Sequence, residues 1–292
     1  MSTPPGSVYS GSAGVNAGVT AGVTAGVIAT RAHEVRNHAL DRLKLGHPVL
    51  VATVRDARSG DIARMLKACD YDVLVIDLEH MSLPGDAVHE IAMTALDVGI
   101  TPLIRLPDHA PGPISRALSH AALGIVAPHV GNADEARMIV NAARFAPDGE
   151  RAVPPMFPHF GYRTITQAGA IAQLAAATMV VALIETAEGL DNADEIAAVP
   201  GIDVLFLGTS DLAQAMGIAG QKDHPVIGAA TARIVGACRH HGKIPGIGGI
   251  TETVQFERAL AAGMLYLSAG SDTSFLLAGA REQARTLRAL VP

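Results

Sequence analysis

The regular alternation of short apolar runs with longer amphipathic segments constrains the fold of this chain more than any other feature. From residue 48 onward, runs rich in Val, Ile and Leu recur, and each is followed by a segment with helical periodicity. The expected strands span residues 48–54, 72–78, 102–106, 124–128, 180–184, 204–207, 244–247 and 265–268. Eight strands, each with its own helix, within about 250 residues predict a (β/α)₈ barrel of the TIM type.

The main alternative is a doubly wound open sheet. That fold would be expected to carry a glycine-rich phosphate loop after its first strand, and the sequence VATVRDA at 51–57 contains no glycine. The helices expected for a barrel span residues 61–69, 85–96, 114–122, 133–145, 190–198, 212–216 with 226–240, 253–262 and 274–290. The longest interruption, 146–178, is rich in proline and is interpreted as a substrate lid or binding loop.

The first 30 residues differ from the rest of the chain. They contain the repeat AGVTAGVTAGVIA and no Lys or Arg before Arg31. Low-complexity sequence of this kind has little to bury, so residues 1–30 are expected to be a flexible tail and residues 31–292 a single barrel domain. The segment also lacks the positive amino-terminal region of a secretory signal. Helical periodicity over 31–45 predicts a helix that closes one end of the fold.

Composition excludes several classes of partner. Of 292 residues, 49% are hydrophobic and 17% are charged, which predicts a folded globular protein. The net charge of −6 comes with no basic cluster, which argues against nucleic acid and anionic membrane surfaces as partners. No apolar run approaches the roughly 20 residues of a membrane span. Cys69 and Cys238 are expected to be buried free thiols, consistent with a reducing cytoplasm.

Two carboxylates follow consecutive predicted strands. Glu185 ends the apolar run 180–184, and Asp211 follows the run 204–207. Because the carboxyl ends of parallel strands meet on one face of a barrel, these two side chains are expected to lie close together. Neighbouring anionic oxygens repel each other unless a cation lies between them, and Mg²⁺ prefers such ligands. The structural alternative is that Glu185 caps the next helix and that Asp211 is a helix N-cap.

The ends of other predicted strands carry imidazole, guanidinium and carboxylate groups. His80 is interpreted as a general base, and His129 is a second candidate catalytic imidazole. Arg105 either binds a substrate carboxylate or pairs with a neighbouring acidic residue. Asp77 is interpreted as structural. A ring of such residues at strand ends is typical of an enzyme.

Three further residues are given structural interpretations. Asp272 stands at an expected helix start, where an aspartate is more often an N-cap than a ligand. His240 and His241 stand at a helix end beside Gly242, where imidazoles are expected to favour the helix C-terminus rather than to bind metal.

Several ordered segments together resemble the HpcH/HpaI aldolase family, the class II pyruvate aldolases related to citrate lyase β and macrophomate synthase. They are VIDLEH (75–80), PLIRLP (102–107), ALGIVAPHV (122–130), DEARMIVNAARFAPDGER (134–151), LIETAEGLDNADEIAAVPGIDVLFLGTSDL (183–212) and AGSD (269–272). The resemblance implies a (β/α)₈ barrel and a homo-hexamer, a trimer of dimers, whose last helix is exchanged between subunits.

The resemblance also implies a chemistry. Mg²⁺ or Mn²⁺, with Co²⁺ possible, would be held by Glu185 and Asp211, and a 2-oxo acid would chelate it. Arg105 would lie beside the developing enolate oxygen, and His80 would be the base. The substrate would further contact Leu183, Gly208, Thr209 and Ser210.

The chain departs from the family pattern at four places. Leu183 replaces the usual Gln, and Gly-Thr-Ser-Asp at 208–211 replaces Gly-Pro-Ala-Asp. Ser119 stands where the family has the Asp that pairs with the base, which would leave the imidazole less firmly oriented. His129 replaces an apolar residue.

The function expected from these residues is that of a metal-dependent carbon–carbon lyase. It would cleave or form a 4-hydroxy-2-oxo acid through a pyruvate enolate, with a 2-oxo acid and an aldehyde as small-molecule partners. An oxaloacetate decarboxylase or a macrophomate-synthase-like enzyme is an alternative, because both need the same enolate. A barrel that binds a 2-oxo acid without turnover is the alternative from another class, supported by Ser119 and Leu183.

Overall fold

The computed structural model describes residues 34–291, and the contacts within the chain place these residues in one compact unit. The expected flexible tail, 1–30, lies outside the described residues. The helix expected over 31–45 is observed as α1, His38–Lys44. Its N-cap, Asn37, accepts a hydrogen bond from the Leu40 backbone N–H at 2.9 Å.

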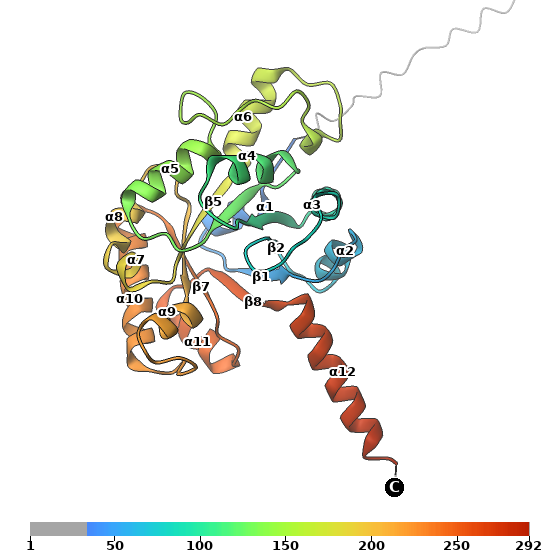
Figure 1. The fold of residues 1–292 in the computed structure, drawn as a ribbon, viewed down its shortest axis with the longest axis vertical. Helices are drawn as coiled ribbons and strands as arrows, with labels where there is room; N and C mark the ends of the chain where they lie inside the picture. The colour runs from blue at the N-terminus through green and yellow to red at the C-terminus, as the bar shows by residue number, and fades with distance from the viewer. Residues whose placement is uncertain (1–33, 292) are drawn as a thin grey trace, which may run out of the picture. The chain divides into compact units, whose positions relative to one another are not determined.

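The eight strands form a closed barrel in which every neighbouring pair is parallel (Figure 1). Their order around the barrel is their order in the chain, which confirms the (β/α)₈ prediction and excludes the open sheet. The strands are β1 Val49–Val54, β2 Val73–Asp77, β3 Thr101–Arg105, β4 Gly124–Ala127, β5 Met179–Ile184, β6 Val204–Gly208, β7 Ile244–Gly248 and β8 Tyr266–Ser271.

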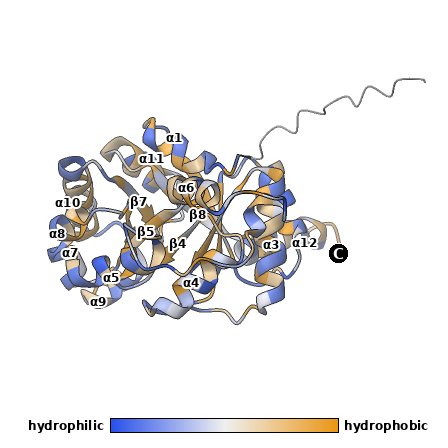
Figure 2. Ribbon diagram, turned by 90° about the horizontal axis from the view of Figure 1, so that it is seen from above, coloured by the Kyte–Doolittle hydropathy of each residue, from blue (hydrophilic) through white to orange (hydrophobic). Residues whose placement is uncertain are grey.

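Helices follow the strands and surround the barrel. They are α2 Asp61–Ala68, α3 Gly85–Val98, α4 Pro111–Ser119, α5 Ala133–Ala143, α6 Gln167–Ala177, α7 Ala187–Asp191, α8 Ala193–Ala198, α9 Thr209–Ala215, α10 Pro225–His241, α11 Thr253–Ala262 and α12 Asp272–Arg288. Figure 2 shows strands of hydrophobic colour enclosed by helices whose outer faces are more hydrophilic.

Two helical features differ from the sequence-based expectation. The expected lid at 146–178 is partly ordered, since it contains a 3₁₀ turn, Pro158–Phe160, and the helix α6. The alanine-rich sequence of α6 has little amphipathic contrast, so periodicity did not reveal it, although its N-cap Thr166 accepts a hydrogen bond from Gly169 at 3.2 Å. The single helix expected over 190–198 is divided into α7 and α8 at Asn192.

The packing of the core shows which end of the barrel is closed and which is open. Side chains inside the barrel, such as Val51, Val75 and Leu103, cluster with Leu40 and Leu43 of α1. Helix α1 therefore closes the amino ends of the strands. A second apolar layer fills the space between the strands and the outer helices. The carboxyl ends of the strands remain open to a pocket.

Helix α12 extends away from the barrel (Figure 1). None of its residues is buried, and it exposes Phe275, Leu276, Leu277 and Leu287. Its N-cap is Ser271, so the assignment of Asp272 as N-cap is wrong by one residue. The Asp272 carboxylate instead accepts hydrogen bonds from the backbone N–H groups of residues 55–57 at 2.8–3.0 Å. These bonds outweigh the effect of burial and lower the pKa of Asp272.

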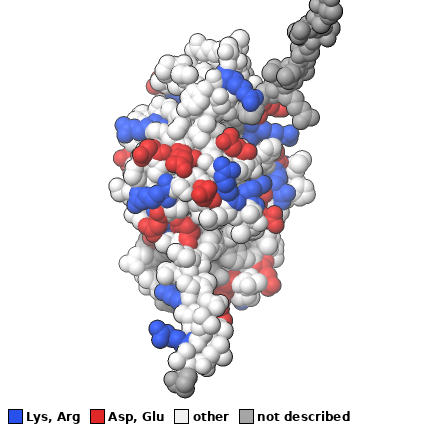
Figure 3. Space-filling view, turned by 90° about the vertical axis from the view of Figure 1, so that its right-hand side faces the viewer, with Lys and Arg blue, Asp and Glu red and all other residues white. Residues whose placement is uncertain are grey.

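Other surface features agree only in part with the sequence-based expectations. Both cysteines are free, but Cys69 is exposed whereas Cys238 is buried, so burial was wrong for Cys69. On the face drawn in Figure 3, acidic and basic side chains are interspersed rather than gathered by sign. In the described part of the chain, no helix combines the length and apolarity that crossing a membrane requires.

His159, in the 3₁₀ turn, gives a prediction for stability. Its ring is 4% exposed, and its Nε2 lies 3.1 Å from the Ala122 carbonyl oxygen. Burial lowers the pKa of His159 to about 4, so the unfolded chain takes up a proton before the folded one does as pH falls. We expect the free energy of unfolding to drop by about 2 kcal/mol between pH 7 and pH 5 through this group.

Urea unfolding at pH 7 and pH 5 measures this loss. The matched variant is His159→Gln, whose amide can still donate to the Ala122 carbonyl but does not titrate. A smaller pH-dependent loss in His159→Gln than in the wild type is expected. Equal losses in the two proteins would contradict the assignment of the acid sensitivity to His159.

Candidate active site

A pocket of about 170 Å³ opens at the carboxyl ends of the strands. Apolar side chains such as Val75 and Leu183 form its floor with the aromatic residues Phe206 and Tyr266. Its charged and polar lining is contributed by residues at several different strand ends, namely Arg55, His80, Arg105, Glu185, Thr209, Ser210 and Asp211. In barrels of this type the carboxyl-terminal end is where active sites lie.

Glu185 follows β5 directly and is the most buried acid of the pocket lining, with 3% exposure. Its Oε1 accepts a hydrogen bond from the His129 backbone N–H at 2.9 Å. Burial, together with the nearby charges of Glu79 and Asp211, raises the pKa of Glu185 to about 7, although the His129 contacts act in the opposite direction. A buried carboxylate among other carboxylates is poised to bind a cation.

The capping alternative for the two carboxylates is wrong. The N-cap of α7 is Thr186, whose side chain accepts a hydrogen bond from Gly189 at 3.0 Å. The N-cap position of α9 is Gly208, and Asp211 lies in the first turn of that helix. Neither Glu185 nor Asp211 is therefore needed to cap a helix, and both line the pocket.

A network of ionic contacts holds Arg105 in place at the end of β3. Asp77, which is fully buried, lies beside Arg105 in the register of β2 and β3 and accepts its Nε–H at 3.0 Å. Its second oxygen accepts from Nη2 of the same guanidinium. Arg105 Nη1 lies 2.9 Å from Oε2 of Glu79. These contacts agree with a structural role for Asp77 and leave Arg105 oriented toward the pocket that it lines.

Asp77 also shapes the loop that carries the candidate base. Its Oδ1 accepts hydrogen bonds from the backbone N–H groups of Glu79 at 3.2 Å and His80 at 3.3 Å. Burial opposes ionisation of this carboxyl, but the Arg105 guanidinium outweighs that effect and lowers the pKa of Asp77. One charged side chain thus fixes both the guanidinium and the loop after β2.

His129 links two acidic residues. Its Nε2 lies 3.0 Å from Oε1 of Glu79, and its Nδ1 lies 3.0 Å from Oε1 of Glu185. Its backbone has a φ of 51°, in the left-handed region that non-glycine residues rarely adopt. Such strain persists only where surrounding contacts impose it. Both ring nitrogens are engaged, so this arrangement suits positioning of Glu79 and Glu185 better than proton transfer.

His80, unlike His129, is not held between acidic residues. Its side chain is 53% exposed, lines the pocket, and has its nearest acidic neighbour at 3.8 Å, between Nε2 and Glu79 Oε2. Ser119, which the family resemblance places where an Asp is expected, donates its hydroxyl to the Ser115 carbonyl of its own helix at 2.8 Å. His80 therefore has a ring nitrogen free to receive a proton, but no firmly held partner among the described residues.

The arrangement can accommodate a divalent ion. Glu79, His129 and Glu185 offer one donor atom each within 4.8 Å of one another. Asp211 lies outside this trio but lines the same pocket as Glu185 and contributes to the field that raises its pKa. Gly208 makes room for the acid, because a Cβ there would stand 2.9 Å from Oε2 of Glu185.

The other residues expected to contact substrate also reach the pocket. Leu183, Gly208, Thr209 and Ser210 all line it. The Thr209 hydroxyl donates to the Gly248 carbonyl at 2.8 Å, which joins the ends of β6 and β7. Gly249, with a φ of +82°, is required there, since a Cβ would stand 2.5 Å from Thr209 Oγ1.

Residues 56–278 match the family model described as HpcH/HpaI aldolase/citrate lyase. The chain belongs to this family. Relatives of the chain in this family are named aldolases, so the chain is a lyase of the aldolase type. The match covers the barrel from the loop after β1 to the start of α12.

Individual relatives agree with this membership. The chain is 35% identical over 217 residues to a 4-hydroxy-4-methyl-2-oxoglutarate aldolase of Chaetomium globosum, covering 73% of this chain and 80% of that one. It is 33% identical over 246 residues to a 4-hydroxy-2-oxo-heptane-1,7-dioate aldolase of Salmonella heidelberg, covering 84% and 92%. The structure of macrophomate synthase shares the fold, with a TM-score of 0.72 at 23% identity, over 88% and 91%.

Sequence reasoning gave no role to Glu79, although the aldolase fold places it between Arg105 and His129. The available signal was its position in the segment DLEH, two residues after the end of β2. A residue at that distance has left regular strand geometry, so alternation along the strand did not predict its direction.

Proposed function

We propose that this protein is a metal-dependent aldolase that cleaves or forms 4-hydroxy-2-oxo acids through a pyruvate enolate. The observation that carries the proposal is the buried carboxylate of Glu185, whose pKa is raised to about 7 by burial and by nearby acids, in a pocket that also holds Arg105. Family membership supports aldol chemistry, and the pocket supports its use of a cation.

In this proposal Glu185 and Asp211 hold Mg²⁺ or Mn²⁺, or Co²⁺ as a further candidate. A divalent cation in that position supplies Lewis acidity that stabilises negative charge on the enolate oxygen. Glu79 and His129 support the ligand set, since His129 contacts both Glu79 and Glu185 at 3.0 Å. His129 is thus a positioning residue rather than the catalytic imidazole first considered.

The remaining steps belong to side chains of this chain. Arg105 donates to the developing enolate oxygen while Asp77 and Glu79 hold its guanidinium. His80 accepts the proton of the 4-hydroxyl group as the C3–C4 bond breaks, which releases an aldehyde. The protonated imidazole then returns a proton to C3 of the enolate, so the same group would exchange the C3 protons of pyruvate with solvent. Leu183, Gly208, Thr209 and Ser210 shape the space around the 2-oxo acid.

A second guanidinium group at the pocket narrows the class of substrate. Arg105 is assigned to the enolate oxygen, so Arg55, which also lines the pocket and is 43% exposed at its side chain, is the guanidinium available to a second carboxylate of the substrate. Two of the similar aldolases are named for dicarboxylic 4-hydroxy-2-oxo acids, which accords with this chemistry. Arg151, in contrast, is 5% exposed and donates to the Leu118 carbonyl at 2.9 Å. It therefore stabilises its own loop rather than binding substrate.

Exchange of the pyruvate methyl protons into D₂O, followed by NMR alongside oxaloacetate decarboxylation, tests the proposal. Exchange that requires added Mg²⁺ or Mn²⁺ and stops with chelator is expected. Decarboxylation without exchange would favour an oxaloacetate decarboxylase or a macrophomate-synthase-like enzyme. Neither reaction, with metal and pyruvate bound, would overturn the aldolase in favour of a non-catalytic 2-oxo-acid-binding barrel.

The two imidazoles are separated by the same two assays. His80→Asn is expected to slow pyruvate exchange by about 10²-fold or more, because the proton acceptor is lost. Oxaloacetate decarboxylation needs the enolate but no base, so it is expected to remain within about threefold of the wild type. His129→Asn is expected to weaken metal binding and to lower both activities in proportion. Equal loss of both activities in His80→Asn would contradict its role as base.

We further propose that the apolar side of α12 packs against another subunit in a homo-oligomer, with a hexamer built as a trimer of dimers as the expected assembly. Phe275, Leu276 and Leu277 are exposed although they are apolar. Figure 3 shows that most of the projecting helix carries uncharged side chains. Apolar area of this kind is normally covered by a partner.

Deletion of residues 273–292 is expected to convert the assembly to smaller species in analytical ultracentrifugation. The barrel should keep its far-ultraviolet circular dichroism apart from the loss of one helix, because α12 contributes no buried residue. Leu276→Glu is the matched point variant. If both variants form assemblies with the same number of subunits as the wild type, the proposed packing of α12 against another subunit is contradicted.

We also propose a cytoplasmic location, because both cysteines are free thiols, as expected in a reducing compartment.

A further inference from the structure

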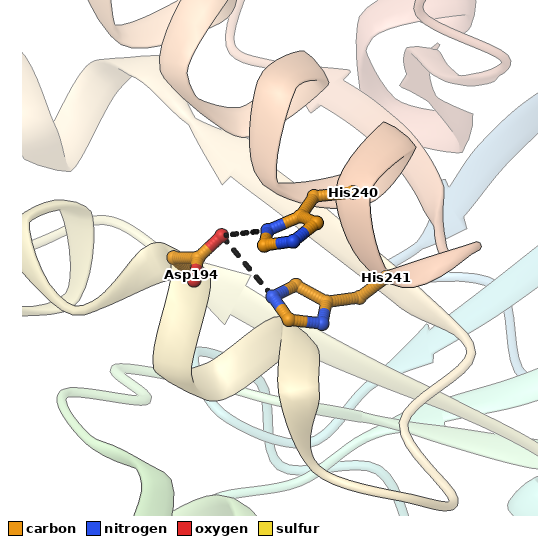
Figure 4. A group of neighbouring side chains, drawn as sticks. All are labelled: Asp194, His240 and His241. Carbon is orange, nitrogen blue, oxygen red and sulfur yellow. Dashed lines mark hydrogen bonds and ion pairs between the residues drawn. The ribbon is translucent and has the colours of Figure 1, made fainter.

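A cluster of two imidazoles and one carboxylate lies on the outer layer of the barrel, away from the pocket. Asp194 stands in the first turn of α8, and His240 and His241 are the last two residues of α10. Figure 4 shows one ring nitrogen of each imidazole beside the same carboxylate oxygen. Asp194 Oδ1 lies 3.1 Å from Nδ1 of His240 and 3.1 Å from Nε2 of His241. None of the three lines the pocket at the strand ends.

The spacing of these donors is that of ligands around one metal ion. The three donor atoms all lie within 4.8 Å of one another. Two ligands that each bind an ion at about 2.0–2.1 Å with tetrahedral angles lie about 3.3 Å apart. The observed 3.1 Å separations are close to that value.

The buried nitrogen of His241 supports the same conclusion. Nε2 of His241 makes no hydrogen bond among the described residues, although it is shielded from solvent and stands 3.1 Å from Asp194 Oδ1. The distance is suitable, so it is the direction of the ring that prevents a hydrogen bond. A ring nitrogen directed to one side of a neighbouring carboxylate oxygen is oriented as it would be toward an ion held by both groups.

The helices that carry the cluster are fixed to each other on either side of it. Arg233 of α10 donates to Oδ1 of Asp191, the last residue of α7 and two residues before α8, at 3.0 Å and to its carbonyl at 2.6 Å. Lys243 Nζ, just after α10, donates to the carbonyls of Val199 at 3.2 Å and Ile202 at 2.8 Å, just after α8. The three ligands therefore need little reorganisation to bind an ion.

We propose that Asp194, His240 and His241 bind one borderline divalent cation, of which Zn²⁺ is the best fit, with water completing the coordination. Two imidazoles and one carboxylate favour Zn²⁺ over Mg²⁺, which prefers oxygen ligands. Bound there, the ion joins the start of α8 to the end of α10. This replaces the sequence-based expectation that the histidine pair serves only the end of its helix, and it does not depend on the proposed aldolase mechanism.

The test is calorimetric titration of the full-length protein with ZnCl₂, together with thermal unfolding. Because the pocket is also proposed to bind a divalent cation, the ions bound per chain are compared among variants. His240→Gln/His241→Gln is expected to bind one Zn²⁺ fewer than the wild type, whereas Glu185→Gln is expected to keep the event assigned to the cluster. The matched control, His38→Gln/His47→Gln, removes two exposed histidines elsewhere and is expected to bind as the wild type does.

Asp194→Asn gives a second, independent readout. It keeps the size of the side chain and is expected to weaken the cluster's Zn²⁺ affinity by about tenfold or more, since it removes the anionic ligand. Zn²⁺ is expected to raise the melting temperature of Glu185→Gln. It is expected not to change the melting temperature of the triple variant Glu185→Gln/His240→Gln/His241→Gln. Equal Zn²⁺ stoichiometry and affinity in the wild type, His240→Gln/His241→Gln and Asp194→Asn would overturn the proposal.

Discussion

Glu185→Gln is expected to reduce metal-dependent pyruvate exchange and aldol cleavage by about 10³-fold or more, because it removes the buried anionic ligand proposed to hold the cation. Glutamine has the same shape but no charge. The fold is expected to be kept, because the pKa of Glu185 is already raised to about 7 by burial, so the folded state gains little from its ionisation. Activity is measured by NMR exchange, and Mn²⁺ binding by electron paramagnetic resonance.

Glu195→Gln is the matched control, because Glu195 lies ten residues further on, in α8, and is exposed to solvent. It should leave exchange and Mn²⁺ affinity unchanged. Chelator treatment of the wild type should reproduce the Glu185→Gln phenotype, and added Mg²⁺ or Mn²⁺ should restore only the wild type. Full activity of Glu185→Gln with an intact fold would remove the metal role from Glu185.

Arg105→Ala is expected to have two large and separable effects. Activity should fall by about 10²- to 10³-fold, since a donor aimed at the enolate oxygen is lost. Stability should fall by about 3 kcal/mol, because the buried Asp77 carboxylate loses the guanidinium that donates to both of its oxygens and keeps only Arg55, whose Nε lies 3.5 Å from Oδ2. Arg105 itself is 13% exposed at its side chain and Asp77 is fully buried, so solvent cannot replace the lost contacts.

The double variant Arg105→Ala/Asp77→Asn separates these effects. Asparagine retains an oxygen for the backbone N–H groups of Glu79 and His80 but carries no charge, so much of the stability is expected to return. Activity is not expected to return, because the guanidinium is still missing. Urea unfolding and steady-state kinetics are measured on the same preparations. Recovery of activity together with stability would show that Arg105 only holds the fold together.

The network around Arg105 also explains why the loop after β2 matters for function. Asp77 anchors both the guanidinium and the backbone of His80, and Glu79 connects Arg105 to His129 and from there to Glu185. Displacement of one member therefore affects the others. This coupling predicts that double substitutions within the network will not be additive.

The sequence alone predicted the barrel and the end of it at which the candidate active site lies. Short β-rich runs and helical segments alternate with two distinct periods, and eight such units within about 250 residues predict a closed parallel barrel, which the observed strand order confirms. Parallel strands must point their carboxyl ends the same way, so Glu185, Asp211 and Arg105 could be assigned to one end before their contacts were known. Helix α6 was missed because its small residues give no amphipathic pattern.

Only the tertiary structure decided which side chains meet. Side-chain direction after a strand ends depends on loop backbone, and local sequence does not encode it; His129, with its φ of 51°, reaches both Glu79 and Glu185 for that reason. Contacts between helices depend on packing across the barrel surface, so Asp194 could not be paired with His240, 46 residues away in sequence. The sequence specifies periods and strand ends, whereas packing between distant segments brings the donor atoms together.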